Sequence, residues 1–313
     1  MKQTIVSIYV PTYNHEKYIV RALDSIRLQK TQYAFEVFVG EDCSTDNTRQ
    51  VLQAWEQKNP DSRFHIFYRQ TNMHGSACSN ALDLKKRCTG KYIICLEGDD
   101  FWTDETKLET QVSFLESHPE YYAVAHNCTV VGADSKPNGE SYPECKDEEY
   151  TFRHFASDIL PGQYTTFLSR NYMIDPNLDN TLMNIPGGAG DRRIYFTLLC
   201  YGKIHCIQKT MSAYRHITAG GSSFSATHTY VYDTQQEDLL HYLNFSYSLG
   251  HPEAIRIAEF LYLRNIRYAS RKGFVKKPRA QADKRNIRHP FRASCLLLKR
   301  DINFRILHKR IHL

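Results

Sequence analysis

The chain has 313 residues, of which 42% are hydrophobic and 24% are charged, and its formal net charge is +6. This composition is ordinary for a soluble globular protein with a full core, and the chain has neither an internal repeat nor a low-complexity tract. No apolar run approaches the roughly 18 residues that span a bilayer, so no membrane helix is predicted. The nine cysteines are scattered without a C-x-x-C pair. This pattern favours buried thiols in a reducing compartment over a disulfide framework or a zinc site.

Charge is distributed unevenly along the chain. From His251 to the end there are 17 Lys and Arg residues against 4 Asp and Glu residues, whereas the preceding part has 23 against 30. An acidic body with a basic tail indicates two functional regions, which we place at residues 1–228 and 229–313. Met1–Thr4 run directly into a predicted strand, so we expect no signal peptide. The expected location is the cytoplasm, with peripheral contact at the inner membrane face as an option for the basic tail.

The first hundred residues alternate strands with helices. The helices carry apolar residues on one face, Ile19, Leu23 and Ile26 in the first of them. This rhythm predicts an α/β fold with a mostly parallel sheet flanked by helices. The predicted strands are Ile5–Val10, Phe35–Val39, Phe64–Tyr68 and Tyr92–Leu96.

Regular structure is less evident after residue 100, until the C-terminal region becomes helical. The pattern predicts a helix around Leu108–Leu115, an exposed loop over 132–145, mixed short strands and loops over 151–185, and a mobile loop over 218–223. The other predicted elements are a strand at Tyr121–Val131, a helix ending near Cys200, a strand at Ile204–Ile207, and helices at Asp233–Leu249 and Glu253–Arg271. The last segment, Phe291–Ile311, alternates basic and apolar residues.

A cluster of carboxylates, Glu97-Gly98-Asp99-Asp100, ends the fourth predicted strand. Three acidic side chains together repel one another near a core unless a cation offsets their charge. Carboxylate oxygens suit hard divalent ions such as Mg²⁺ or Mn²⁺, which also bind phosphates. In open α/β sheets, ligands bind at the carboxyl ends of the strands. The sequence therefore offers two interpretations of the cluster, a metal site and a solvated acidic loop.

Polar residues also follow the first two strands. The first strand ends in Pro11-Thr12-Tyr13-Asn14, and the second ends in Glu41-Asp42-Cys43-Ser44-Thr45-Asp46. If these strands are parallel neighbours, both ends lie on the same edge as the acidic cluster. The residues Ser44 to Asp46 fit helix capping, whereas Asp42 could accept hydrogen bonds from a nucleobase N–H or from ribose hydroxyls.

These motifs, in this order and with this spacing, resemble those of the family 2 glycosyltransferases. The resemblance covers about residues 4–220 and implies the GT-A fold, with the basic helical region as a C-terminal extension. It implies a hexosyltransferase-type enzyme (EC 2.4) that uses a nucleotide-sugar donor, with UDP expected, and a glycan or lipid-linked saccharide acceptor. Such enzymes use Mn²⁺ or Mg²⁺ and invert the anomeric centre, and the implied setting is bacterial surface polysaccharide synthesis.

The resemblance also implies roles for individual residues. The expected metal ligands are Asp99 and His216, and the expected general base is Asp191, for which a helix-capping role is the alternative. His216 could equally be structural, and Trp102 and Asp104 are candidates for the acceptor pocket, with core packing as the alternative for Trp102. The residues assigned to donor binding are Pro11, Thr12, Tyr13, Asn14, Glu41, Asp42, Asn72, Glu97, Gly98 and Arg215.

The chain departs from the family pattern at two positions of the predicted site. Glu97 stands where the first Asp of the family's D-x-D motif is usual, and Cys43 stands where Gly is common. The irregular surroundings of Asp191, together with Glu97, also fit a non-catalytic saccharide-binding relative.

Two other enzyme classes are alternatives to the transferase. A sugar-phosphate nucleotidyltransferase would need a Gly-rich loop after the first strand. A dinucleotide-dependent oxidoreductase would need G-x-G-x-x-G there, and the chain has neither motif. The basic tail is interpreted as a solvated surface or as an anionic-membrane contact. Nucleic acid is not an expected partner, because no recognition module is present and aromatic residues are sparse in the tail.

Overall fold

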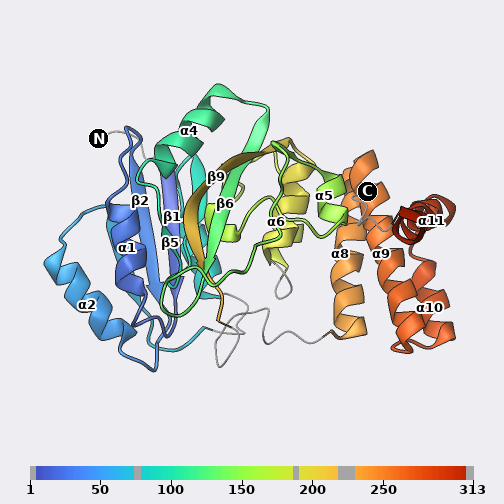
Figure 1. Ribbon diagram of the computed structural model, residues 1–313, viewed down its shortest axis with the longest axis horizontal. Helices are drawn as coiled ribbons and strands as arrows, with labels where there is room; N and C mark the ends of the chain where they lie inside the picture. Colours follow the sequence, from blue (N-terminus) through green and yellow to red (C-terminus); the bar gives the residue numbers. More distant parts are fainter. Residues whose placement is uncertain (1–4, 74–78, 186–189, 218–229, 308–313) are drawn as a thin grey trace. The chain divides into compact units, whose positions relative to one another are not determined.

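The computed structural model describes residues 5–73, 79–185, 190–217 and 230–307, with side chains described as far as residue 300. The chain divides into two compact units (Figure 1). The first comprises residues 1–150, 160–180 and 201–226, and the second comprises 151–159, 181–200 and 227–313. The last of these boundaries lies near the predicted division at residue 228. Two earlier segments group with the C-terminal helices instead.

The amino-terminal half of the first unit alternates strands and helices in the predicted order. Its elements are β1 (Val6–Thr12), α1 (Ile19–Arg27), β2 (Phe35–Glu41), α2 (Thr48–Lys58), β3 (Phe64–Tyr68), α3 (Asn80–Arg87) and β4 (Tyr92–Cys95). The strands lie in the order β3-β2-β1-β4, and all three neighbouring pairs are parallel. The carboxyl ends of β1, β2 and β4 therefore share one edge of the sheet.

The other half of the sheet has strands in both directions. Its elements are β5 (Phe101–Trp102), α4 (Lys107–Ser117), β6 (Tyr121–Val131), β7 (Glu149–Tyr150), η1 (Tyr164–Thr166), β8 (Leu168–Arg170) and β9 (Lys203–Arg215). The order continues β4-β8-β6-β9-β5, with β7 also on β9. Only β6 and β9 are parallel here, and the other pairs are antiparallel. The sheet is thus parallel in its first half and mixed in its second.

Strand β9 is much longer than the predicted strand at Ile204–Ile207. It continues as far as Arg215, and its middle residues Gln208, Lys209 and Thr210 are exposed. The apolar pattern breaks at these residues while backbone pairing with β6 continues through local register shifts. This extension carries Arg215 to the same sheet as the acidic cluster, which the sequence pattern did not predict.

The core of the first unit lies between the parallel strands and their helices. Ile19, Leu23 and Ile26 of α1 are all fully buried, which confirms the predicted inner face of this helix. Each such side chain stabilises the fold by about 1.5–3 kcal/mol through burial. The packing holds the loops at the carboxyl edge of the sheet on a rigid base.

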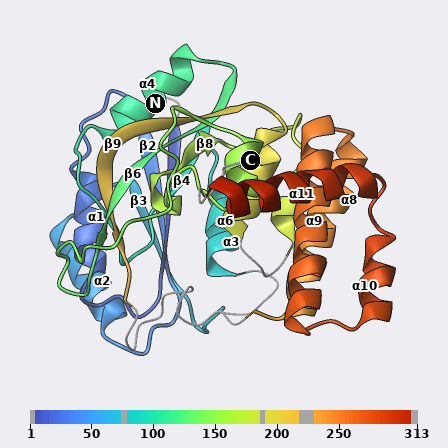
Figure 2. The same cartoon turned by 45° about the vertical axis from the view of Figure 1, so that its right-hand side comes forward.

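The second unit is helical and includes the basic tail. Its elements are α5 (Phe152–Ala156), η2 (Leu182–Asn184), α6 (Gly190–Leu199), α8 (Tyr232–Leu249), α9 (Pro252–Lys272), α10 (Lys277–Lys284) and α11 (Pro290–Leu307). Helices α8 and α9 lie side by side, and α11 crosses α9 (Figure 2). Gly250 and Gly273 end α8 and α9 with φ angles of 71° and 73°, which glycine adopts without steric cost.

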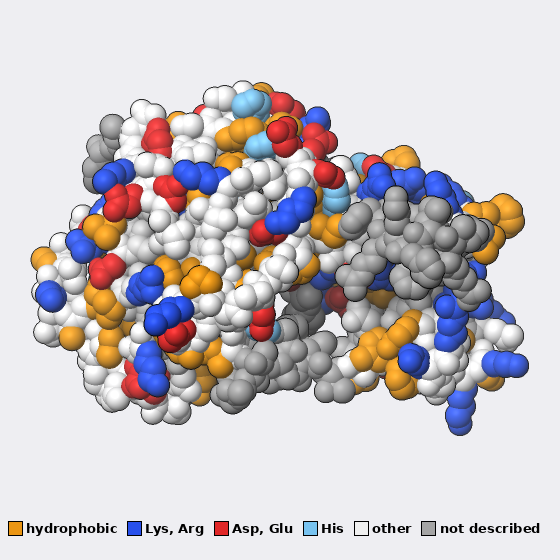
Figure 3. Space-filling model, in the orientation of Figure 1, with side chains coloured by type: hydrophobic (Ala, Val, Ile, Leu, Met, Phe, Trp, Pro, Cys, Tyr) orange, Lys and Arg blue, Asp and Glu red, His pale blue; other side chains and the backbone are white. Residues whose placement is uncertain are grey.

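The surface of the second unit reflects the charge asymmetry of the sequence. Blue Lys and Arg side chains gather over this unit on the face shown in Figure 3, with few acidic ones among them. Among the helices that the structure describes, none combines the length and apolar character needed to cross a membrane. Helix α10 was not predicted, because its sequence offers only two alanines as an apolar pattern.

Candidate active site

The ends of β1, β2 and β4 are tied together by backbone hydrogen bonds. Asp42 N donates to Thr12 O at 3.0 Å, and Gly98 N donates to Pro11 O at 3.1 Å. Thr12 and Glu41 are also register partners in the sheet. The three motifs recognised in the sequence therefore meet at one edge of the first unit, as expected if their strands are parallel neighbours.

Gly98 allows the acidic loop to approach the end of β1 closely. A Cβ atom at this position would lie 2.6 Å from Thr12 Oγ1 and 2.7 Å from His15 Nδ1. These two side-chain atoms are themselves 3.1 Å apart. No side chain fits at residue 98 without displacing its neighbours, so glycine is a steric requirement of the site.

His15 links this contact to the carboxylate of Asp99. Its Nε2 atom lies 3.9 Å from Asp99 Oδ2, and the two side chains are 15% and 25% exposed. Burial lowers the pKa of His15, while the charges of Asp99 and Asp46 oppose that shift. His15 was not among the predicted site residues. The only signal was its place directly after the Pro11–Asn14 motif.

Asp100 is the buried member of the acidic cluster. Its Oδ1 atom accepts a hydrogen bond from Arg215 N at 2.7 Å, whereas its buried Oδ2 atom has no hydrogen-bond partner among the described residues. Burial raises the pKa of Asp100 well above its usual range, and the charges of Asp99 and Glu97 raise it further. A cation bound here would relieve this repulsion, so the carboxylates fit a divalent metal ion.

Arg215 donates hydrogen bonds both to the acidic loop and to residues 132–135. Its Nε atom donates to Asp99 O at 2.8 Å, its Nη2 atom to Ser135 Oγ at 2.8 Å, and its Nη1 atom to Gly132 O. The guanidinium carbon also lies 3.9 Å from the centroid of the Tyr18 ring. The side chain is 2% exposed, so in this structure it joins the Asp99 loop to residues 132–135.

The residues on either side of Arg215 lie near the same cluster. Burial and the charges of Asp100, Glu97 and Asp99 raise the pKa of Tyr214. The Nδ1 atom of His216 lies 2.5 Å from Glu140 Oε2, which comes from the predicted exposed loop. Glu140 is therefore a partner of His216 that sequence analysis missed.

The end of β2 contains two carboxylates with different surroundings. Glu41 is fully buried and accepts hydrogen bonds from Ser44 N and from Arg49 Nε, each at 2.6 Å. Asp42 Oδ1 accepts from Met73 N at 2.9 Å, and Asn72 Nδ2 donates to Asp42 O at 2.9 Å. Glu41 thus holds the loop in place, and Asp42 brings the predicted donor residue Asn72 to the same edge.

The two loops that follow β1 and β2 are joined through Asn14. Its Oδ1 atom accepts from Thr45 N at 2.9 Å, and its own N–H donates to Ser44 Oγ at 3.0 Å. Tyr13, beside it, is 40% exposed. Cys43 has a φ of 56°, in the left-handed region that favours glycine. The glycine common at this position in the family therefore has a conformational reason.

The two acceptor candidates differ in their surroundings. Trp102 is 4% exposed and belongs to the main hydrophobic core, with its Nε1 atom donating to Thr165 O at 3.3 Å. Asp104 Oδ2 pairs with Lys209 at 2.6 Å, and Asp104 Oδ1 accepts from Thr106 N. Burial raises the pKa of Asp104, but the hydrogen bonds from Lys209 and Thr106 outweigh it and lower the pKa to about 2. For Trp102 the structure favours the core-packing interpretation.

Asp191 belongs to the second unit. It lies in the first turn of α6, where its Oδ1 atom accepts a hydrogen bond from Arg192 N at 2.8 Å. The preceding residues 186–189 are outside the described part of the chain, as is the predicted loop at 218–223. The acidic cluster belongs to the first unit and Asp191 to the second.

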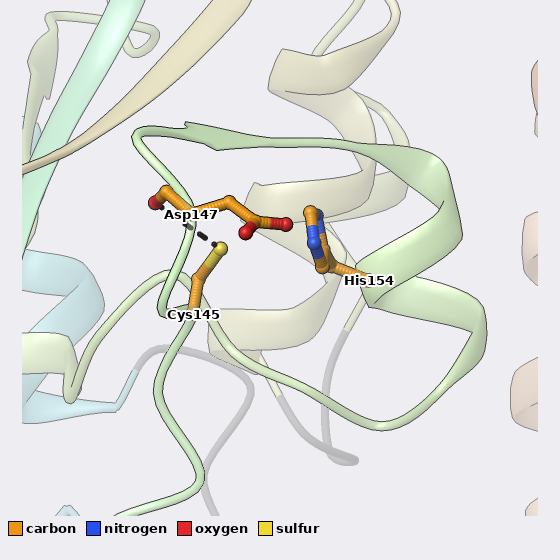
Figure 4. A group of neighbouring side chains, drawn as sticks. All are labelled: Cys145, Asp147 and His154. Atoms are coloured by element: carbon orange, nitrogen blue, oxygen red, sulfur yellow. Dashed lines mark hydrogen bonds between the residues drawn. The ribbon is translucent and has the colours of Figure 1, made fainter. Parts of the chain in front are cut away.

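Cys145 and Asp147 follow the long loop after β6, and Figure 4 shows the Cys145 thiol donating to Asp147 O at 3.6 Å. His154, also drawn there, belongs to α5 of the second unit, where its Nδ1 atom accepts from Thr151 N at 3.1 Å. These residue types are common metal ligands, but they are divided between the two units, and no metal site is assigned to them.

The fold and the assembled edge define a class of protein. The chain matches the family model "Glycosyl transferase family 2" over residues 7–189, and it belongs to that family of glycosyltransferases. The match contains Thr12, Asp42 and the acidic cluster. It ends before Asp191 and before the Tyr214–His216 segment.

Relatives of the chain include proteins of known and unknown activity. Uncharacterized protein Rv1520 of Mycobacterium tuberculosis is 31% identical over 217 residues, which are 69% of this chain and 59% of that protein. The poly(ribitol-phosphate) beta-N-acetylglucosaminyltransferase TarS of Staphylococcus aureus is 35% identical over 115 residues, 36% of this chain and 19% of TarS. The chain thus spans about 59% of the length of the mycobacterial relative.

Solved structures confirm the predicted GT-A fold. The structure of S. aureus TarS residues 1–349 in complex with UDP-GlcNAc has a TM-score of 0.62 at 20% identity, covering 91% of this chain and 79% of that one. The mannosyltransferase PcManGT from Pyrobaculum calidifontis, in complex with GDP-Man and Mn²⁺, has a TM-score of 0.51 at 14% identity, covering 95% and 88%. At these identities the similarity concerns the fold alone.

Proposed function

We propose that this protein transfers a sugar, with inversion, from a UDP-linked donor to an acceptor hydroxyl in the synthesis of a cell-surface polysaccharide. The observation that carries the proposal is the meeting of Thr12, Asp42 and the Glu97–Asp100 cluster at the carboxyl edge of parallel strands. The UDP donor is inferred from the TarS structure, which contains UDP-GlcNAc. The polymeric product is our inference from the poly(ribitol-phosphate) in the name of TarS.

In this proposal the nucleoside of the donor binds at the ends of β1 and β2. Asp42, held by Met73 N and 7% exposed, presents an acceptor for nucleobase or ribose groups, and Thr12 lies beside it. Asn14, Tyr13, Pro11 and Asn72 shape the same edge. Glu41 acts indirectly, because its carboxylate is occupied by Arg49 and Ser44.

Asp99 and Glu97 provide the anionic end of the donor site. Asp99 is the ligand we propose for Mn²⁺ or Mg²⁺, and the orphan Oδ2 atom of Asp100 supports a cation nearby. When bound, such an ion stabilises the negative charge that develops on the departing nucleoside diphosphate. Gly98 and Arg215 keep the loop in position, and His216 is a second proposed ligand.

The acceptor hydroxyl needs a base, because a neutral hydroxyl is a poor nucleophile. We assign this proton transfer to Asp191 in the first turn of α6. Asp104 remains a proposed acceptor contact. A carboxylate base typically contributes a factor of about 10²–10⁴ to the rate.

Release of nucleoside diphosphate from a panel of UDP- and GDP-sugars, with Mn²⁺ or Mg²⁺ and candidate acceptors, tests the proposal. Asp99→Asn and Asp191→Asn are expected to lower turnover at least 100-fold, and chelation of the metal should abolish it. Asp233→Asn changes a carboxylate that is 80% exposed and serves as the control.

Four outcomes would contradict parts of this assignment. Turnover that survives Asp99→Asn would remove the metal role from the acidic cluster. A preference for GDP-sugars would overturn the UDP donor. Tight donor binding without turnover over a broad acceptor panel would favour a binding protein, and pyrophosphate release from a nucleoside triphosphate would indicate a nucleotidyltransferase.

A further inference from the structure

Helix α11 has two distinct faces within the second unit. Ala293 and Leu297 are buried, at 1% and 4% exposure, and they are four residues apart on the inner face. Phe291, Cys295 and Leu298 are exposed, Phe291 by 83% and Leu298 by 58%. Residues spaced by three, four and seven positions share one side of a helix. Phe291, Cys295 and Leu298 therefore form a continuous apolar line on the outer face, which we call the α11 stripe.

Basic residues border the α11 stripe. Arg292 and Lys299 follow Phe291 and Leu298 by one position each, and both are exposed. Because they are seven residues apart, they lie along one flank of the stripe. Arg288, just before the helix, is exposed as well. The segment from His251 to the end has 17 basic and 4 acidic residues, so this apolar line lies in a strongly positive region.

The orientation of the α11 stripe is fixed by a buried carboxylate. Glu259 of α9 is fully buried, and its Oε1 atom accepts hydrogen bonds from His289 N at 2.8 Å and from Tyr247 OH at 2.9 Å. Its Oε2 atom lies 3.5 Å from Arg292 Nη2. Helices α8 and α9 thus hold the start of α11, and the apolar line points outward as part of a packed unit.

The end of α9 repeats this combination of exposed aromatic and basic residues. Tyr268 and Phe274 are 46% and 56% exposed, and their ring centroids are 6.3 Å apart. Arg271 and Lys272, in the last turn of the helix, are also exposed. Aromatic and aliphatic side chains next to Lys and Arg are typical of surfaces that lie in the headgroup region of a bilayer.

We propose that the α11 stripe and its basic flank dock on an anionic lipid surface. Phe291 and Leu298 would enter the boundary between headgroups and acyl chains, while Lys299 and Arg288 contact lipid phosphates. The positive charge of the region favours this occupant over a second copy of the chain, whose equivalent face would carry the same charge. The inference is independent of the reaction proposed above.

Co-sedimentation of the full chain with vesicles tests this docking. One set of vesicles is phosphatidylcholine alone, and the other is phosphatidylcholine with about 30% phosphatidylglycerol. This anionic content is on the order of that which gives a surface potential of tens of millivolts. We expect binding to the anionic vesicles only, and its loss when salt rises to about 0.5 M, because screening shortens the range of the attraction.

Two variants separate the charged and apolar parts of the surface. Lys299→Glu changes the charge by two units and should weaken vesicle binding about 30-fold, since each charge near an anionic surface is worth about fivefold. Phe291→Ser with Leu298→Ser should weaken it at least tenfold. The matched controls lie in the first unit. Lys58→Glu is the control for the charge change, and Leu28→Ser with Ile174→Ser is the control for the apolar change. Leu28 and Ile174 are 50% and 55% exposed. Circular dichroism and the thermal midpoint verify folding of every variant.

Other results would overturn the proposal. Equal binding to neutral and anionic vesicles, or unchanged binding by both α11 variants, would remove the docking surface. A wild-type dimer in light scattering that becomes monomeric in the Phe291→Ser, Leu298→Ser variant, without vesicle binding by either, would identify the stripe as a contact between copies. Binding of a single-stranded RNA in place of vesicles, with the same loss in Lys299→Glu, would assign the basic flank to nucleic acid.

Discussion

Replacing Arg215 by lysine distinguishes two roles for this residue. In the structure its guanidinium donates to Asp99 O, Gly132 O and Ser135 Oγ and lies against the ring of Tyr18. The family resemblance instead implies a contact with the donor diphosphate. Lysine keeps the charge but replaces a planar, multidentate donor with a single ammonium group.

The expected loss of stability follows from these contacts. A lysine ammonium could retain one of the three hydrogen bonds, so two bonds from a charged donor are lost. Each such bond is worth about 1.5–3 kcal/mol. The acceptor oxygens that lose their bonds lie beside a side chain that is only 2% exposed, so water does not readily replace the lost donors. We expect Arg215→Lys to lower the free energy of unfolding by about 3 kcal/mol or more and to weaken the binding of Mn²⁺ by loosening the Asp99 loop.

Urea unfolding followed by fluorescence measures the stability, and Mn²⁺ titration followed by electron paramagnetic resonance measures the metal affinity. Arg21→Lys is the matched control. Arg21 is exposed and its described contact is with the Phe101 ring, 3.5 Å from the guanidinium carbon. The control should change stability by less than about 1 kcal/mol. If Arg215→Lys unfolds like the wild type and raises only the KM for the donor, the structural role is refuted and the phosphate contact is supported.

Substitutions at three further positions test the local geometry and electrostatics. Gly98→Ala should lower the free energy of unfolding by about 1–3 kcal/mol and weaken donor binding, because its Cβ would lie 2.6 Å from Thr12 Oγ1; an unchanged urea midpoint would contradict this. Cys43→Gly should be tolerated with full donor turnover. Cys43→Val should lower the free energy of unfolding by about 1–2 kcal/mol, because the φ of 56° at this position is unfavourable for a β-branched residue. A higher thermal midpoint for the Val variant than for the Gly variant would show that the backbone angle does not matter. Burial lowers the pKa of Lys107 well below its ordinary value, so between the native and unfolded pKa values the unfolded chain binds a proton that the native chain does not. The stability contributed at Lys107 therefore rises with pH in that window, by up to about 1.4 kcal/mol per pH unit. Lys107→Met should flatten this dependence in urea unfolding at several pH values, and parallel profiles for the two proteins would refute it.

The sequence was informative where structure is local and periodic. The strands at Phe64–Tyr68 and Tyr121–Val131 have the predicted bounds, and the first helix buries its predicted face. Short connections between apolar strands and amphipathic helices leave few arrangements other than a parallel sheet. The sequence was less informative over 151–185, where α5 and β8 are short and their partners are distant in the chain.

The acidic cluster, too, could be predicted from the sequence only in part. Its composition and its place after a buried strand were enough to identify the edge of the sheet at which a ligand would bind, since strand direction is a local consequence of the β/α alternation. The motifs also placed Thr12 and Asp42 at that edge, where the structure has them. The family of the chain followed from these same residues.

Only the tertiary structure decided how the members of the cluster differ. Asp100 is buried and bonded to Arg215 N, whereas Asp99 is partly exposed beside His15. Arg215 and His15 are 200 residues apart in the chain and reach the cluster through the long β9 strand and the loop after β1. Long-range contacts of this kind depend on pairing between distant segments, which leaves no periodic signal in either one. The sequence by itself determined the chemistry available at this site, and the packing of distant strands determined which side chains hold it in place.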